Sequence, residues 1–267
     1  MNLQRLFGLE GKVALVTGGA GGLGRAITEG LLEAGAARVY IASRKLASLK
    51  EVADALSRDG RCVPIAADLS TIAGCRGLAE EIGKREKSLD ILVNNSGTPW
   101  SAPFATFPES GWDKVFALNL KAPFFLTQAL APLLAEGASD ENPARVINIG
   151  SVAGNISNGA GTYPYGLSKG ALHHATRMLA LELAPQKILV NAIAPGRFAT
   201  KMTKYVTDDQ PRYDAEVALI PTHRWGADDD IAGTAIFLAS HASAYITGAV
   251  IPVDGGTQLV HPFDMAG

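Results

Sequence analysis

The sequence predicts an α/β fold, a doubly wound parallel sheet of about seven strands with helices on both faces. Two observations lead to this prediction. Short apolar segments rich in β-branched residues alternate with segments of helical periodicity along the whole chain of 267 residues. In addition, a run of glycines directly follows the first apolar segment. Strands this apolar, each separated from the next by a helix, form βαβ units in which helices cover both faces of a parallel sheet.

Each strand is expected from a short apolar run and each helix from an apolar stripe. The expected strands are residues 12–17, 38–42, 63–67, 90–94, 145–149, 188–193 and 249–253. The expected helices are residues 22–34, 46–56, 72–86, 112–134, 165–183 and 228–240.

The stretch from Pro195 to Arg224 interrupts this alternation. It is polar and mixed, with two short helical pieces at most. A long insertion beyond the carboxyl end of a strand is where a substrate lid lies in such a fold. No internal repeat, low-complexity tract or linker divides the chain. We therefore expect a single domain over residues 1–267, with a lid segment at about 197–226.

The composition excludes several classes of protein. The chain has 24 basic and 26 acidic residues and a net charge of -2, so it lacks the basic excess of a dedicated nucleic-acid binder. With 47% hydrophobic and 19% charged residues, it is not an intrinsically disordered chain. We expect no membrane segment and no secretory signal. Cys62 and Cys75 lie outside any metal-ligand spacing, which predicts a reduced, cytoplasmic protein without a metal site.

A nucleotide-binding turn is expected between the first strand and the first helix, where residues 17–24 read TGGAGGLG. Glycine lets a ligand approach the backbone closely, and the N–H groups and dipole of the following helix favour a diphosphate. The alternative is a tight turn without a ligand, but the flanking strand and helix supply the context of a dinucleotide site. The cofactor contacts expected here are Gly18, Ala20, Gly22, Leu23 and Gly24.

The residues after the second strand indicate which dinucleotide is bound. A dinucleotide fold places its ribose-binding residue about 20 residues beyond the glycine turn. This chain has Ser43 and Arg44 there in place of a carboxylate. A guanidinium binds a 2′-phosphate, whereas a carboxylate would repel it. The alternative is that Arg44 and Lys45 are solvated charges at the start of a helix. The pattern favours NADPH, with NADH as the weaker cofactor.

A tyrosine and a lysine, Tyr165 and Lys169, lie four residues apart at the start of a predicted helix and so share one face. Tyrosine is a poor acid–base catalyst at neutral pH because its free pKa is about 10. A nearby ammonium favours the phenolate and brings the pKa towards the working range. Such a pair is by itself usually a surface contact. Ser151, just after the fifth strand, indicates a site instead, because parallel sheets build active sites at the carboxyl ends of their strands.

Together these motifs resemble the short-chain dehydrogenase/reductase family. The resemblance implies a single NAD(P)-binding Rossmann domain and an NAD(P)-dependent oxidoreductase acting on CH–OH groups. It covers nearly the whole chain. It is carried by the glycine turn, the NNSG run at 94–97, Asn119, Ser151, the Tyr165-x-x-x-Lys169 pair and Pro195-Gly196.

The resemblance implies a role for each catalytic residue. Tyr165 donates a proton to the carbonyl oxygen, and Ser151 hydrogen-bonds the same oxygen. Lys169 holds the nicotinamide ribose and lowers the pKa of Tyr165, while Asn119 holds a water of the proton relay. Tyr165 and Lys169 thus also count as cofactor contacts. The further contacts implied are Asp68, Leu69, Asn95, Ser96, Gly97, Pro195, Gly196, Phe198 and Thr200.

Two positions depart from the family pattern. Ser96 replaces the usual alanine, a small change that should be tolerated. Gly21 stands where many NADPH-dependent members carry a basic residue, so discrimination for the 2′-phosphate rests on Ser43 and Arg44. The family also implies a homotetramer.

A narrower resemblance is to the bacterial β-ketoacyl reductases associated with rhamnolipid formation. It is carried by residues 110–112, 141–154, 194–198 and 224–226. It implies NADPH-dependent reduction of a ketone to a secondary alcohol, the substrate being a 3-oxoacyl thioester or another β-keto compound. Two alternatives stay open. One is an NAD-dependent dehydrogenase of a secondary alcohol or sugar. The other is a non-catalytic NADPH-binding protein, a class that often lacks the tyrosine or the lysine.

Two further features are assigned to packing first. His173 and His174 follow the lysine on the same helix, and no partner lies at metal-ligand spacing, so we expect one to be buried and one to lie at a helix interface. Trp100, after the fourth strand, is expected either to line the substrate pocket or to anchor its loop.

Overall fold

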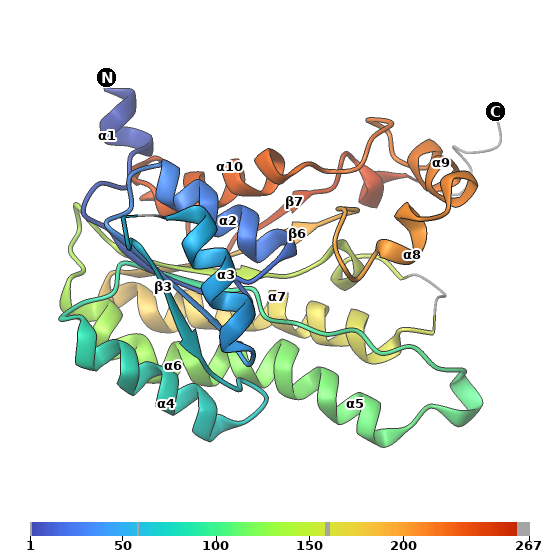
Figure 1. Ribbon diagram of the computed structural model, residues 1–267, viewed down its shortest axis with the longest axis horizontal. Helices are drawn as coiled ribbons and strands as arrows, with labels where there is room; N and C mark the ends of the chain where they lie inside the picture. Colours follow the sequence, from blue (N-terminus) through green and yellow to red (C-terminus); the bar gives the residue numbers. More distant parts are fainter. Residues whose placement is uncertain (1, 58, 158–160, 261–267) are drawn as a thin grey trace.

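The computed structural model describes residues 2–57, 59–157 and 161–260. A seven-stranded sheet forms its centre, in the order β3-β2-β1-β4-β5-β6-β7 (Figure 1). Every neighbouring pair is parallel. The strands are β1 (Val13–Thr17), β2 (Arg38–Ser43), β3 (Cys62–Ala66), β4 (Ile91–Asn94), β5 (Ala144–Ile149), β6 (Ile188–Pro195) and β7 (Val250–Val253). The predicted fold class is therefore confirmed, with each strand within two residues of its expected ends.

Helices cover both faces of the sheet (Figure 1). On one face α2 packs against α10, with α3 on the same side, and on the other face α4 packs against α6 and α7 packs against α5. The longer helices are α2 (Gly22–Glu33), α3 (Leu46–Leu56), α4 (Ile72–Arg85), α5 (Glu109–Phe116), α6 (Ala122–Glu136), α7 (Tyr163–Leu183) and α10 (Asp228–Ala239). The shorter ones are α1 (Leu3–Phe7), α8 (Lys204–Thr207) and α9 (Gln210–Ala218).

Two apolar layers hold the helices to the sheet. One joins β1 and β2 to α2 and α10 through side chains such as Ile27 and Ile231, both fully buried. The other joins β4 and β5 to α4 and α6 through Leu92 and Leu126. Each such side chain contributes about 1.5–3 kcal/mol when it leaves water. Cys62 and Cys75, both free thiols, are part of these layers.

The order of the strands predicts a crevice at the carboxyl ends of the strands. The chain runs outwards from β1 to β3, then returns so that β4 pairs with β1 on its other side. Helices leave β1 and β4 towards opposite faces, so their carboxyl ends diverge and leave room for a ligand. The side chain of Thr17 ties the two ends together, since its hydroxyl accepts the N–H of Asn95 at 2.9 Å and of Ser96 at 3.0 Å.

The helix expected at residues 112–134 differs from the observed structure. A π-helical segment, Ala117–Lys121, separates α5 from α6. A π-helical turn holds one residue more than an α-helical turn, and such segments are frequent at functional sites. The apolar periodicity of the sequence does not reveal this insertion because both flanking helices keep their own stripes.

The segment after β6 has the two short helices that the sequence allows, α8 and α9, which lie together at one end of the molecule (Figure 1). It has a small apolar cluster of its own, made by Val206, Ile220 and Trp225. No helix among the described residues is long and apolar enough to cross a membrane.

Candidate active site

The glycine turn after β1 is shaped for a close approach of main chain to ligand. Gly18 and Gly22 have φ of 70° and 52°, the left-handed region that favours glycine. A Cβ at Gly24 would overlap the Gly18 carbonyl and the Asn95 amide. Gly21 caps α2 without any side-chain hydrogen bond, so the first N–H groups of that helix have no side-chain acceptor. The turn therefore fits an anionic group such as a diphosphate.

The residues that flank this turn stay close to the core. Ala20 and Leu23 pack against the apolar layer of α2 and α10, and both are partly buried. They are therefore able to line the crevice wall with apolar surface.

The end of β2 carries the predicted phosphate-binding pair. Arg44 is exposed and Ser43 is half-buried. Asp68 lies near them: hydrogen bonds from Ser70 lower the pKa of its carboxyl, and the charge of Arg44 lowers it further. Leu69, in contrast, is only 4% exposed and packs in the core with α4. The cofactor contact of Leu69 stays a prediction.

The loop after β4 joins this region to the predicted catalytic residues. Asn95 donates to the carbonyl of Thr17 at 2.9 Å, which fixes the loop to the glycine turn. A Cβ at Gly97 would lie 3.4 Å from Oδ1 of Asn119 and 3.6 Å from Nζ of Lys169. Gly97 thus keeps the space open between the loop, Asn119 and Lys169.

Asn119 lies in the π-helical segment and is completely buried. Its Oδ1 accepts the N–H of Thr98 at 2.8 Å. Its Nδ2 donates to the carbonyl of Thr98 and to Oγ of Ser168, each at 3.1 Å. The side chain therefore links the β4 loop to α7, one residue before Lys169. An Oδ1 lone pair is left to hold a water.

Ser151, Tyr165 and Lys169 meet at the carboxyl end of β5. The side chains of Ser151 and Tyr165 are hydrogen-bonded to each other. Lys169 is 4% exposed, and its Nζ donates to the carbonyl of Ile149 at 2.6 Å. The same Nζ lies 5.8 Å from the centre of the Tyr165 ring. The structure thus brings together the three residues that the sequence predicts as catalytic.

Burial dominates the electrostatics of this group. It lowers the pKa of Lys169 to about 8, because an ammonium is costly to keep away from water. It also raises the pKa of Tyr165, although the hydrogen bond from Ser151 and the charge of Arg197 act in the opposite direction. This net direction is opposite to the one expected from the Tyr–Lys spacing. The reason is that the loss of water around a phenolate outweighs the Ser151 hydrogen bond and the charge of Arg197.

The segment after β6 closes the other side of the crevice. Gly196 donates its N–H to the carbonyl of Val253 at 2.9 Å, so Pro195 and Gly196 stay within the sheet. The Cγ2 of Thr200 would lie 3.2 Å from a Cβ on Gly22, so this segment contacts the glycine turn. Phe198 is only 4% exposed and packs in the core. The contact of Phe198 with the nicotinamide stays a prediction.

Two features at the site are missing from the sequence prediction. Arg197 pairs with Glu216 of α9, with Nε 3.1 Å from Oε2, and its charge reaches Tyr165. His173 is 3% exposed, as expected for one of the two histidines, and its ring contacts the loop that carries Ser151. His174 is exposed, so the helix interface expected for the other histidine is wrong. No local sequence signal marks these two contacts, because Glu216 and the loop of Ser151 lie far from Arg197 and His173 in the chain.

Trp100 anchors its loop. A Cβ on Gly111 of α5 would lie 2.6 Å from the indole nitrogen, and Lys114 lies over the ring at 5.2 Å. The sequence allows Trp100 either to line the substrate pocket or to anchor its loop, and this contact supports the anchor.

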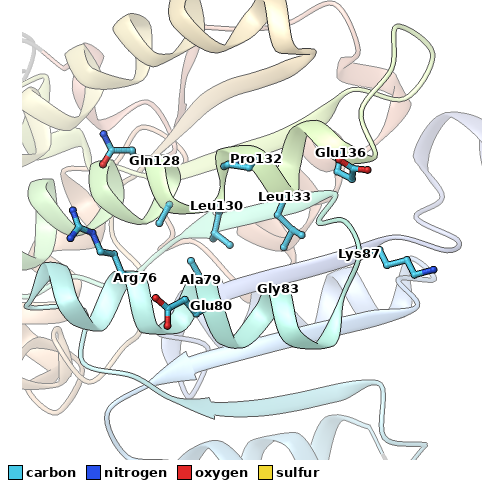
Figure 2. Close-up of a pocket in the computed structure, with 11 residues that line it drawn as sticks. Arg76, Ala79, Glu80, Gly83, Lys87, Gln128, Leu130, Pro132, Leu133 and Glu136 are labelled. Carbon is cyan, nitrogen blue, oxygen red and sulfur yellow. The ribbon is translucent and has the colours of Figure 1, made fainter.

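A cavity of about 610 Å³ lies away from this centre, between α4 and α6. Figure 2 shows that its walls carry both charges, with Arg76 and Glu80 from α4 and Glu136 from α6. None of the predicted site residues lines it. Within the described part of the chain, no group of three or more His, Cys, Asp or Glu side chains is placed to hold a metal ion.

Comparisons with known proteins agree with this arrangement. A family model described as enoyl-(acyl carrier protein) reductase matches residues 18–258. The rhamnolipids biosynthesis 3-oxoacyl-[acyl-carrier-protein] reductase of Pseudomonas aeruginosa is 52% identical over 253 residues, which are 95% of this chain and 98% of that protein. The chain belongs to the short-chain dehydrogenase/reductase family. Its members act as oxidoreductases on CH–OH groups, and the predicted enzyme class is confirmed.

One further relative and two solved structures are informative for this short-chain dehydrogenase/reductase. The 2-dehydro-3-deoxy-D-gluconate 5-dehydrogenase of Escherichia coli is 39% identical over 94% of this chain and 96% of that protein. The structure titled Pseudomonas aeruginosa RhlG/NADP active-site complex has a TM-score of 0.92 at 51% identity, covering 97% of this chain and all of that one. A gluconate 5-dehydrogenase from Burkholderia cenocepacia in complex with NADP and tartrate has a TM-score of 0.89 at 32% identity, covering 97% of this chain and 100% of that one. The narrower resemblance seen in the sequence is confirmed by the first relative.

Proposed function

We propose that this enzyme uses NADPH to reduce a ketone to a secondary alcohol, with a 3-oxoacyl thioester or another β-keto compound as the substrate. The observation that carries the proposal is the hydrogen-bonded pair of Ser151 and Tyr165, with Lys169 buried beside it, at the mouth of an uncapped glycine turn. NADP in the similar RhlG structure and the 52% identity to a 3-oxoacyl reductase support the cofactor and the substrate class.

The cofactor is held by main chain at one end and by side chains at the other. The N-terminus of α2 binds the diphosphate, and Ser43 with Arg44 binds the 2′-phosphate. Asp68 limits the net positive charge of this subsite, since its carboxylate lies close enough to sense Arg44. The bound nicotinamide supplies the hydride, and the protein supplies position and electrostatics.

The protein's own residues move the proton. Tyr165 donates its phenolic proton to the carbonyl oxygen, and burial keeps that proton in place until it is needed, because it raises the pKa of the phenol. Ser151 hydrogen-bonds the same oxygen and orients it. Lys169 holds the ribose and stabilises the phenolate once the proton has left. Asn119 holds the water through which the proton is replaced.

The segment at about 197–226 acts as the substrate lid of a single domain that spans the chain. Its own apolar cluster and the ion pair between Arg197 and Glu216, both inside the segment, support its movement as a unit. Arg197 also favours a second candidate, an NAD(P)-dependent dehydrogenase of an acidic sugar, because its guanidinium lies near Tyr165 and suits a carboxylate. The gluconate dehydrogenases among the relatives support this candidate. A non-catalytic role is disfavoured, since the tyrosine and the lysine are both present and joined in one site.

We also place the enzyme in the cytoplasm as a homotetramer. Large apolar side chains on α6 and α7 are exposed in the single chain: Phe124, Leu167, Met178 and Leu181. Apolar surface of this extent on two neighbouring helices suits an interface between copies. Sedimentation velocity would give a mass about four times that of the 27.9 kDa chain, and a monomer would overturn this part of the proposal.

The first experiment is NADPH oxidation with an acetoacetyl thioester, followed by absorbance. The NADH reaction, 5-ketogluconate as a second substrate, and the Tyr165→Phe variant are run in parallel. We expect turnover of the thioester that prefers NADPH and falls by about 10²- to 10⁴-fold in Tyr165→Phe, with NADPH binding retained. Turnover of the ketogluconate alone would favour the sugar dehydrogenase. Full activity of Tyr165→Phe would overturn the assigned mechanism.

A further inference from the structure

His173 lies one helical turn beyond Lys169 on α7, buried under the loop that carries Ser151. The main-chain N–H of Ser151 points at its Nε2, with the two nitrogens 3.5 Å apart. The other ring nitrogen, Nδ1, lies 3.0 Å from Oδ1 of Asn155, at the far end of the same loop. One imidazole thus joins both ends of the segment from Ser151 to Asn155.

These contacts determine the tautomer of the ring. A main-chain N–H only donates, so Nε2 of His173 must be the acceptor and carry no proton. The proton of the neutral ring then lies on Nδ1 and is donated to Oδ1 of Asn155. The amide of Asn155 is oriented to match, because its Nδ2 donates to Oε1 of Gln258 at 2.7 Å. The N–H of Gln258 in turn donates to Asp254, just beyond β7, at 2.9 Å.

The loop is shaped around this ring. A Cβ on Gly150 would lie 2.7 Å from Cδ2 of His173, and one on Gly154 would lie 2.9 Å from Cε1. Distances below 3.0 Å leave no room for a side chain at either glycine. The main chain on each side of Ser151 is therefore in direct contact with the imidazole, and a shift of the ring would shift the serine.

The surroundings keep the ring neutral. Burial, followed by the positive charges of Lys169 and Arg177, lowers the pKa of His173 to about 4. A protonated ring would place a second N–H against the N–H of Ser151. The neutral form is thus the one that the hydrogen bonds require.

We propose that His173 is a positioning residue for the reduction: its neutral Nδ1–H imidazole fixes the main chain at Ser151 and ties that loop, through Asn155 and Gln258, to the end of β7. The catalytic importance of this contact rests on the proposed function, because it assumes that Ser151 orients the substrate carbonyl. The imidazole itself touches neither substrate nor cofactor. It acts by holding Ser151 within hydrogen-bonding distance of Tyr165.

Substitutions test the role of the ring nitrogen. His173→Leu keeps the volume but removes the acceptor, and His173→Gln offers an amide oxygen at a similar distance along the side chain. We expect kcat to fall on the order of 10- to 100-fold in His173→Leu, with the KM for NADPH changed less than about twofold, and most of kcat to return in His173→Gln. His174→Leu, at the exposed neighbour, is the matched control and keeps wild-type kinetics. A His173→Leu enzyme with full kcat, or an equal loss in Leu and Gln variants, would overturn the proposal.

A measurement without turnover covers the case in which His173→Leu does not fold. In the wild-type protein labelled with ¹⁵N-histidine, the shifts of the two ring nitrogens report which one carries the proton. His173→Gln identifies the signal by its absence. We expect the Nδ1–H form, and a proton on Nε2 would refute the arrangement. If the wild-type enzyme reduces no ketone, the proposed function is wrong. The measured tautomer of His173 still shows in that case whether the imidazole holds the loop of Ser151.

Discussion

The two sides of the crevice at the carboxyl edge of the sheet are built by different means. On the side of β1, the glycine turn presents main-chain groups and lacks any side-chain cap. On the side of β5, the site consists of side chains from separate elements: Ser151 after the strand, Lys169 on α7 and Asn119 in the π-helical segment. These side chains are nearly all withdrawn from water. The β1 side of the crevice is thus determined by backbone conformation, and the β5 side by the burial of polar groups.

This difference teaches which kind of change each side tolerates. A site built from main chain loses its shape when a Cβ is added where there is no space, whatever the polarity of the new side chain. A buried polar site fails when a hydrogen-bond partner or a proton is lost. The predictions below test this contrast, starting with the largest effect.

The Gly24→Ala and Gly21→Ala variants form a matched pair on the backbone side. A Cβ at Gly24 would meet the Gly18 carbonyl carbon at 2.9 Å, whereas one at Gly21 meets nothing within 4 Å. We expect Gly24→Ala to lower the free energy of unfolding by about 1–3 kcal/mol and to weaken NADPH binding with it. Gly21→Ala should stay within about 0.5 kcal/mol of wild type. Urea unfolding without cofactor measures both, and equal stabilities would contradict the role assigned to close packing.

Arg44→Asp tests the exposed cofactor subsite, with Lys45→Asp as a control of equal charge change. Loss of a charge-assisted contact to the 2′-phosphate costs about 1.5–3 kcal/mol, so NADPH affinity should fall by roughly 10- to 100-fold. NADH affinity should change little, because NADH has no phosphate at this position. Fluorescence titration of both cofactors gives the ratio. An unchanged preference in Arg44→Asp, or the same change in Lys45→Asp, would show that the subsite lies elsewhere.

The pH profile tests the buried side. Lys169 has its pKa lowered to about 8, so its proton is present below that pH and is lost above it. In the proposed mechanism the ammonium supports the proton donor Tyr165, so kcat/KM for ketone reduction should fall above about pH 8, by up to roughly tenfold per pH unit. In Lys169→Arg the guanidinium keeps its charge, so any remaining activity should not show this decrease. A wild-type profile that stays flat to about pH 10 would exclude Lys169 as the titrating group.

The smallest effect is expected at the ion pair near the end of the proposed lid segment. Arg224 binds Asp230 through two hydrogen bonds of 2.6 and 2.9 Å, and the pKa of Asp230 is lowered to about 2, by Arg224 first and then by the N–H of Ala227. A lowered pKa means that the stabilisation is present above the unfolded pKa of 3.8 and is lost as the pH falls through about 2. Since the pair is largely exposed, Asp230→Asn should cost no more than about 1 kcal/mol at pH 7. Thermal unfolding at pH 7 and pH 2 measures the effect of Asp230→Asn on the Tm, with Asp229→Asn as control. Equal changes in Tm at the two pH values would refute the stabilisation by this ion pair.

The sequence by itself determined the sheet and the backbone side of the crevice. Apolar strands, helical stripes and the glycine run are local patterns, so each strand was placed within two residues of its ends and the turn was placed at 17–24. The spacing of Tyr165 and Lys169 is also local, since one helical turn puts both on the same face. The place of Ser151 just after the fifth strand is local as well. Asn119 came from the family resemblance alone.

Only the tertiary structure decided how the polar groups are buried. It placed Asn119 in a π-helical segment, withdrew Leu69 and Phe198 into the core, and brought Arg197 to Glu216 of α9. It also reversed the expected pKa direction of Tyr165 and put His173 against the Ser151 loop. Such properties depend on how much water the whole fold removes from a group and on which partners from distant strands and helices replace that water. A local pattern fixes the dihedral angles and periodicity of a segment, but the desolvation of a side chain is set by every element that packs around it.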